Sequence, residues 1–165
     1  MTRSGEFFFT LMSGKARLDG IYHSTCQNGA FGEPVRLPDT VNVSEGSFDG
    51  VVSADGNYYL VDVTSKKEDS FGETDIYVTF RSPDNGWSSL INLGPTINSK
   101  MNETVCGVSP DGQYLFFCAY FGRLNLYHDK PSYRDILYSS QKPGYGNADI
   151  YWVSTRVIER LRPPR

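Results

Sequence analysis

Short apolar runs that alternate with tight turns are the main pattern of this sequence. Residues 105–108 form an apolar run, residues 109–112 read Ser-Pro-Asp-Gly, and residues 113–117 form an aromatic-rich run. Proline fixes φ at about −65° and glycine supplies a positive φ, so the four central residues predict a sharp reversal of the chain. The pattern therefore predicts two strands joined by a hairpin turn.

The same pattern occurs twice more. Residues 51–61 repeat it with Ser-Ala-Asp-Gly at the turn, and Ser53 lies 56 residues before Ser109. Residues 4–10 match the second half of the pattern and begin inside its turn, one strand late. A repeat at a fixed spacing constrains the architecture more strongly than any single residue does.

Each unit continues with further strands. A strand containing Ile-Tyr follows the aromatic run in all three units, at residues 20–24, 75–79 and 149–153. An Asn-Gly pair and then a short apolar run follow in the first two units, with the Asn-Gly pairs at 28–29 and 85–86 and the runs at 34–37 and 90–93. Asn-Gly between such runs predicts a type I′ hairpin turn, in which both central residues have positive φ. The three units thus supply three, four and three strands, ten in all.

The third unit is irregular and adds helices. Apolar residues spaced i, i+3 and i+4 after Pro131 predict a short helix near residues 131–139. A second apolar pattern with helical spacing covers residues 155–161 and stops at Pro163-Pro164.

Four-stranded antiparallel units with a period near fifty residues predict an all-β protein, a β-propeller. We expect one partial propeller domain over residues 1–165, with blade units at about 1–42, 43–98 and 99–154 and a C-terminal helix at 155–161.

The strand signatures resemble the TolB-type, WD-like propeller repeat. The segments that carry the resemblance are 75–78, 86–87, 92–99 and 109–117, and segment 146–154 with its tail resembles the last blade of bacterial six-bladed members. Ala54 stands where the family usually has proline and Ser4 where it has aspartate, so the earlier units are degenerate. The resemblance implies a binding scaffold or the gating domain of a serine peptidase. It also implies a periplasmic or secreted protein.

Three units are too few for a closed ring, because a propeller normally has four or more blades. Open blade faces and strand edges favour association. Two copies completing a six-bladed ring are one solution, and we predict such a homo-oligomer. The other is that the chain is the C-terminal half of a longer propeller, which a start inside the Ser4-Gly5 turn favours.

Charge and hydropathy exclude two partner classes. The net charge is −3 and no basic stripe is present, so we do not expect nucleic acid as a partner. No apolar run approaches the roughly 18 residues of a membrane span. The apolar run at residues 7–12 is short for a signal peptide, and as written the sequence predicts a cytoplasmic protein.

Cysteine and histidine spacing predicts neither metal nor cofactor. Cys26, Cys106 and Cys118 form an odd set without CxxC spacing, and we interpret them as free, partly buried thiols rather than as a disulfide or metal site. His23 and His128 have no metal-ligand spacing.

Loop length predicts where a partner binds. The tight Asp-Gly and Asn-Gly turns fall on one face of the ring and the long loops on the other, and function concentrates on long loops held by a rigid scaffold. Aromatic and charged side chains on this long-loop face suit a protein, peptide or glycan partner. The expected binding residues are Lys66, Lys67, Phe71, Tyr120, Phe121, Arg123, Tyr127, His128, Asn102 and Glu103.

Two functions from different classes remain. The first is a non-catalytic binding scaffold. The second is a hydrolase of glycosidic or peptide bonds, with a channel site formed in the completed ring. The chain has no Gly-x-Ser-x-Gly elbow, and nothing in the sequence pairs two carboxylates across a bond, which favours the first.

Overall fold

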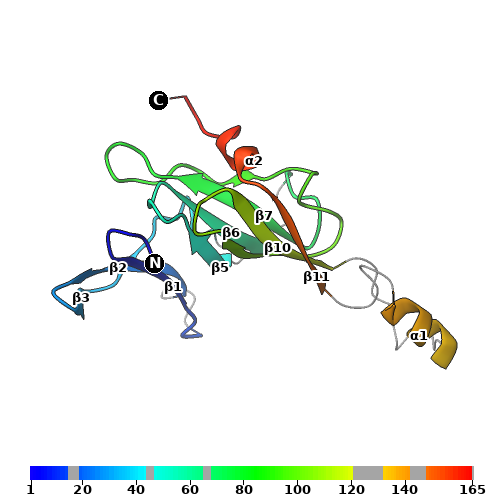
Figure 1. Ribbon diagram of the computed structural model, residues 1–165. Helices are drawn as coiled ribbons and strands as arrows, with labels where there is room; N and C mark the ends of the chain where they lie inside the picture. The colour runs from blue at the N-terminus through cyan, green and yellow to red at the C-terminus, as the bar shows by residue number, and fades with distance from the viewer. Residues whose placement is uncertain (15–18, 44–46, 65–67, 121–131, 142–147, 165) are drawn as a thin grey trace.

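The computed structural model of the 165-residue chain describes residues 1–14, 19–43, 47–64, 68–120, 132–141 and 148–164. Within these residues the protein is mostly β, with eleven strands in three antiparallel sheets and two short helices. Figure 1 shows the blue N-terminal sheet at one side of the molecule and helix α1 projecting at the other. The expectation of an antiparallel all-β protein is confirmed.

The first sheet contains β1 (Glu6–Leu11), β2 (Gly20–Gln27), β3 (Ala30–Phe31) and β4 (Val35–Arg36), all paired through β2. The ten strands expected from the sequence do not include β3. It forms because Asn28 and Gly29 have φ of 53° and 81°, the signs that a type I′ turn requires. This turn folds β3 back onto β2.

The second sheet contains β5 (Ser47–Val52), β6 (Tyr58–Thr64), β7 (Thr74–Phe80) and β8 (Ile91–Asn92), in that order. These are the four strands expected for the second unit. The turn at Asn85-Gly86 differs from the prediction, because Asn85 has a positive φ of 64° whereas Gly86 does not. This turn is therefore not of type I′.

The third sheet has the order β11-β10-β9, with β9 (Glu103–Val108), β10 (Tyr114–Tyr120) and β11 (Ala148–Ser154). Helix α1 (Tyr133–Ser140) begins with a capping box, in which Ser132 and Asp135 satisfy each other's backbone N–H groups. Helix α2 (Arg156–Glu159) follows β11 directly. Both helices lie where the sequence predicts them.

Two equivalent asparagines, Asn42 and Asn98, hold strands at their positions in the first two sheets. The side chain of Asn42 accepts the N–H of Ile21 at 2.7 Å and donates to the carbonyl of the same residue at 3.1 Å. Asn98 does the same with Ile76, at 2.9 Å for both bonds. Both asparagines are buried. The 56-residue spacing thus corresponds to a repeated structural contact.

The second sheet is buried on both faces. Side chains of β6 alternate, so that Tyr58 and Leu60 lie in a core shared with the third sheet, whereas Tyr59, Val61 and Val63 lie in a core shared with the first. All five are buried. Ile158 of α2 joins the former core and closes one end of it. The three sheets therefore stack face to face, with the second in the middle.

Candidate functional site

Only part of the expected long-loop face lies within the described residues. Lys66, Lys67, Phe121, Arg123, Tyr127 and His128 lie outside them. Tyr120 ends β10, and its side chain is also outside the description. Phe71, Asn102 and Glu103 remain.

The three described residues lie close together but in different environments. Phe71 is exposed, whereas Glu103 is fully buried. The Glu103 carboxylate accepts the backbone N–H of Ser99 at 2.9 Å and the hydroxyl of the same residue. Glu103 therefore holds the loop before β9, and its oxygens are engaged within the protein.

The loop before β7 packs tightly against the link between the second and third sheets. Asn102 donates to Glu73 Oε2 at 3.0 Å, and the N–H of Glu73 donates to the carbonyl of Met101 at 3.1 Å. A Cβ on Gly72 would come within 2.2 Å of that same carbonyl, so a larger residue does not fit there. Phe71 is thus presented from a loop that is fixed at its base.

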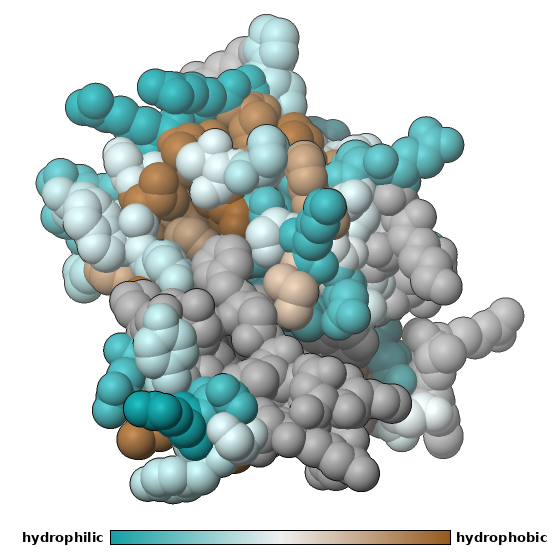
Figure 2. Space-filling model, turned by 90° about the vertical axis from the view of Figure 1, so that its right-hand side faces the viewer, coloured by the Kyte–Doolittle hydropathy of each residue, from teal (hydrophilic) through white to brown (hydrophobic). Residues whose placement is uncertain are grey.

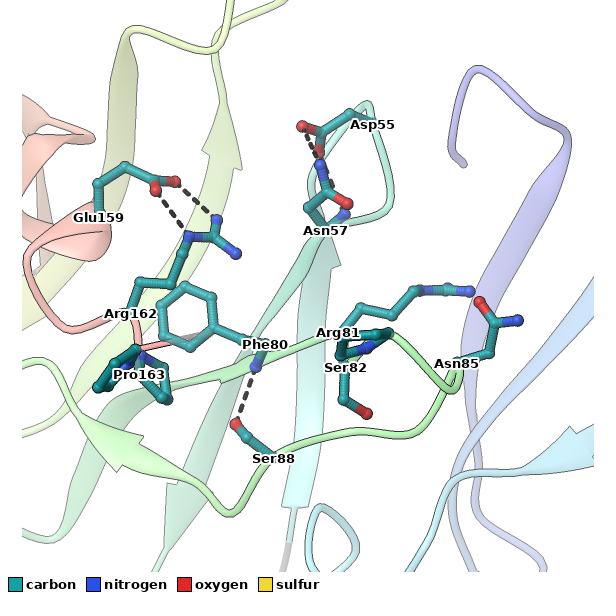
Figure 3. A pocket seen from close by; sticks show the side chains of 12 residues that line it. Asp55, Asn57, Phe80, Arg81, Ser82, Asn85, Ser88, Glu159, Arg162 and Pro163 are labelled. Carbon is teal, nitrogen blue, oxygen red and sulfur yellow. Dashed lines mark hydrogen bonds and ion pairs between the residues drawn. The ribbon is translucent and has the colours of Figure 1, made fainter.

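A pocket lies at the end of the sheets opposite to Phe71. It has a volume of about 710 Å³ and lies between the β5–β6 turn, the end of β7 and the segment around α2 (Figure 3). Its lining includes Asp55, Asn57, Phe80, Arg81, Glu159 and Arg162. The sequence indicates only tight hairpin turns at this edge of the sheets, and the pocket could not be predicted from them. The pocket depends on the position of α2 above these turns, which no local sequence pattern indicates.

The cations of this pocket are already paired. Arg162 donates two hydrogen bonds to Glu159, at 2.8 and 2.9 Å, and its guanidinium lies 4.5 Å from the ring centre of Phe80 (Figure 3). The Glu159 contact raises the pKa of Arg162. Arg81 Nη2 lies 2.9 Å from Glu6 Oε2. With both guanidiniums neutralised, the pocket offers a polar and stacking surface rather than a strong anion site.

The pKa of Asp55 in the same pocket is lowered. Burial acts to raise this pKa, but hydrogen bonds from Ser53 and Asn57 outweigh it by stabilising the carboxylate. A carboxyl held ionised in this way is unsuited to act as a general acid near neutral pH.

Asp62 is the carboxyl whose pKa is raised furthest toward neutrality among the described residues. It lies buried on β6 and accepts the N–H of Val105 from β9 at 2.9 Å. Burial raises its pKa to about 7, and the charge of Asp49 contributes in the same direction. The contact joins the second sheet to the third.

The outer faces of the two terminal sheets are apolar and exposed. On the third sheet, Ile150 and Trp152 are 70% and 66% exposed, and the ring of Tyr114 meets that of Trp152 edge-on at 5.3 Å. Figure 2 looks onto the side near α1 and shows hydrophobic atoms exposed among polar ones. On the first sheet, exposed Phe7 stacks on Phe9. Both ends of the stack thus present aromatic surface.

Within the described part of the chain, no group of three or more His, Cys, Asp or Glu side chains is arranged to hold a metal ion. His23 packs on Phe8, and desolvation lowers its pKa, with Arg81 acting in the same direction and Glu6 against it. Neither of the two described helices has the length and hydrophobicity needed to cross a membrane.

The fold defines a mostly β protein of three stacked antiparallel sheets. No family model, curated protein or solved structure matches the chain.

Proposed function

We propose that this protein is a non-catalytic interaction scaffold of the β-propeller type, with each sheet acting as one blade. The observation that carries the proposal is the face-to-face stacking of three antiparallel sheets in chain order, the first two with equivalent asparagine contacts at Asn42 and Asn98. Propellers are built from such repeated sheets, and a rigid stack of this kind presents its loops in fixed positions.

The binding surface in this proposal is the long-loop face, and the partner is a protein, peptide or glycan. Exposed Phe71 supports it, because aromatic side chains on a fixed base lose little entropy on binding. Asn102 and Glu73 add a polar pair beside it. Lys66 and Lys67 are expected to contribute positive charge.

Peptide and glycan arrays probed with the purified chain test this function. We expect a restricted set of bound peptides or glycans, and we expect Phe71→Ala to weaken binding to them at least tenfold. Pro83→Ala, at the opposite end of the sheets and also exposed, is the control and should bind normally. Absence of binding to both arrays, or equal loss in the two variants, would overturn the proposal.

We also propose that the two open apolar faces bind a second copy of the chain. The outer face of the third sheet of one copy would pack on the outer face of the first sheet of the other, and the reverse contact would close a ring of six sheets. Aromatic surface at both ends of the stack supports this arrangement. Sheets from elsewhere in a longer polypeptide would serve the same purpose.

The alternative function, a hydrolase with a channel site, rests on Asp62 and Asp49. The raised pKa of Asp62 and the effect of the Asp49 charge on it are features of paired catalytic carboxyls. In this alternative, chromogenic glycosides or peptides would be cleaved, and Asp49→Asn would abolish cleavage. Against it, Asp62 is buried and already bonded to Val105.

A further inference from the structure

Cys106 and Cys118 lie next to one another on adjacent strands of the third sheet. Their Sγ atoms are 3.1 Å apart, and Cys106 is exposed while Cys118 is half-buried. The alternate residues of β10, Leu115, Phe117 and Ala119, are buried in the core shared with the second sheet. Cys118 therefore projects from the outer face of the third sheet, and the two thiols meet on that face.

An irregularity in strand pairing brings the two cysteines together. The register of β9 against β10 shifts between Phe116 and Phe117, so Cys106 is the extra residue of a β-bulge. Cys118 pairs in register with Thr104, and in a regular ladder Cys106 would be its diagonal neighbour, about 7–8 Å away. A bulge re-aims the side chain that it carries. Here it directs the thiol of Cys106 onto that of Cys118.

We propose that Cys106 and Cys118 form an intramolecular disulfide. The oxidant is a low-molecular-weight disulfide such as oxidised glutathione. The exposed Cys106 thiolate attacks one glutathione sulfur and releases the first glutathione thiolate. Cys118 then attacks Cys106 Sγ and releases the second. Overall, the two protein thiols transfer two electrons and, through water, two protons to the oxidant, which is reduced to two molecules of glutathione thiol.

The environment favours a structural bond over a catalytic one. Desolvation, followed by the hydrogen bond with Cys118, raises the pKa of the Cys106 thiol to about 11. Catalytic and redox-sensing cysteines instead have lowered pKa values, because the thiolate is the reactive form. Because little thiolate is present at neutral pH, the bond would form slowly.

The position of the bond suggests what it stabilises. Val105, directly before Cys106 in the bulge, donates its N–H to Asp62 of the second sheet at 2.9 Å. A disulfide at Cys106 would hold the bulge in place and so preserve this contact between the second and third sheets. It would cross-link β9 to β10 across the Ser109–Gly112 turn.

Mapping of thiols by mass spectrometry tests the proposal. The purified chain is equilibrated with oxidised and reduced glutathione, then unfolded in denaturant with an alkylating reagent, so that burial shields no thiol. We expect a cross-linked peptide joining Cys106 to Cys118, which disappears when reductant precedes alkylation. Cys106 and Cys118 found alkylated, glutathionylated, linked to Cys26 or linked between chains would overturn the proposal.

Thermal unfolding supplies a second readout with a matched control. Reductant should lower the melting temperature of the wild type and of Cys26→Ser by roughly 5 °C or more, because a cross-link restricts the unfolded chain. Cys118→Ser cannot form the disulfide, so its melting temperature should be the same with and without reductant. A reductant effect of equal size in all three proteins would contradict the disulfide.

Discussion

Arg81 and Glu6, 75 residues apart in the chain, form an ion pair that joins the second sheet to the first. Arg81 Nη2 lies 3.0 Å from one Glu6 carboxylate oxygen and 2.9 Å from the other. The Arg81 Nε atom donates to the carbonyl of Gly56, and the guanidinium lies 4.8 Å from the ring centre of Trp87. Both ionic side chains are largely buried, so the pair is little screened by water.

Glu6→Gln should therefore destabilise the protein by about 2–3 kcal/mol, because it leaves a largely buried guanidinium without its counter-charge. Urea unfolding of the variant and of the wild type measures this difference. Asp39→Asn is the control, since Asp39 also pairs with an arginine, Arg36, but its side chain is 90% exposed. No measurable change is expected there. Equal effects of the two substitutions would contradict a structural role for the Glu6 pair.

Asn98→Ala should destabilise the protein by roughly 2–4 kcal/mol, because the N–H and carbonyl of Ile76 would both lose their buried partner. Asn42→Ala should have a comparable effect through Ile21. The control is Asn57→Ala, whose exposed amide bonds to Asp55 at the β5–β6 turn. Unfolding midpoints in urea should fall clearly for the first two variants and little for the third. A midpoint unchanged in Asn98→Ala would contradict the assignment.

Repetition made much of the strand arrangement predictable. Ser53 and Ser109 hold their turns in the same way, each accepting a backbone N–H from the tyrosine five residues later, and the sequence match reflects this shared geometry. Strand β3 was not predictable at the same level, because it depends on how far the Asn28-Gly29 turn folds back. The Asn85-Gly86 turn shows that an identical dipeptide adopts another geometry in another context.

The candidate sites were less predictable, because contacts between sheets decide them. The long-loop rule identified Phe71 as exposed surface, but no local pattern distinguishes it from buried Glu103. The close approach of Cys106 and Cys118 depends on a bulge, which shifts register by one residue and leaves no clear sequence signal. The pocket beneath α2 depends on where the chain returns after β11.

Asp62 makes stability depend on pH. Its pKa is about 7 in the folded protein against an ordinary 3.8, so between these values the folded state keeps a proton that the unfolded state has lost. Stability should therefore fall as the pH rises from about 4 to about 7 and then level off. Asp62→Asn keeps an acceptor for the Val105 N–H and removes the titration, so it should be more stable than the wild type at pH 8. Urea unfolding at pH 5 and pH 8 measures both effects, and an unaltered pH dependence in Asp62→Asn would contradict the assignment.

Trp152→Glu and Phe7→Glu should each convert a dimer into a monomer, because they place a charge on the outer faces of the third and first sheets. Light scattering coupled to size exclusion should give twice the 18.5 kDa chain mass for the wild type and the single mass for each variant. Tyr133→Glu is the control, since Tyr133 is an exposed aromatic residue on α1 rather than on a sheet.

Mixing the Trp152→Glu and Phe7→Glu variants should partly restore dimers, because the third sheet of Phe7→Glu can still pack on the first sheet of Trp152→Glu. A dimer that pairs two identical faces, first sheet with first sheet or third with third, would instead lose its contact in one variant and keep it in the other. A monomeric wild type would refute the six-sheet ring.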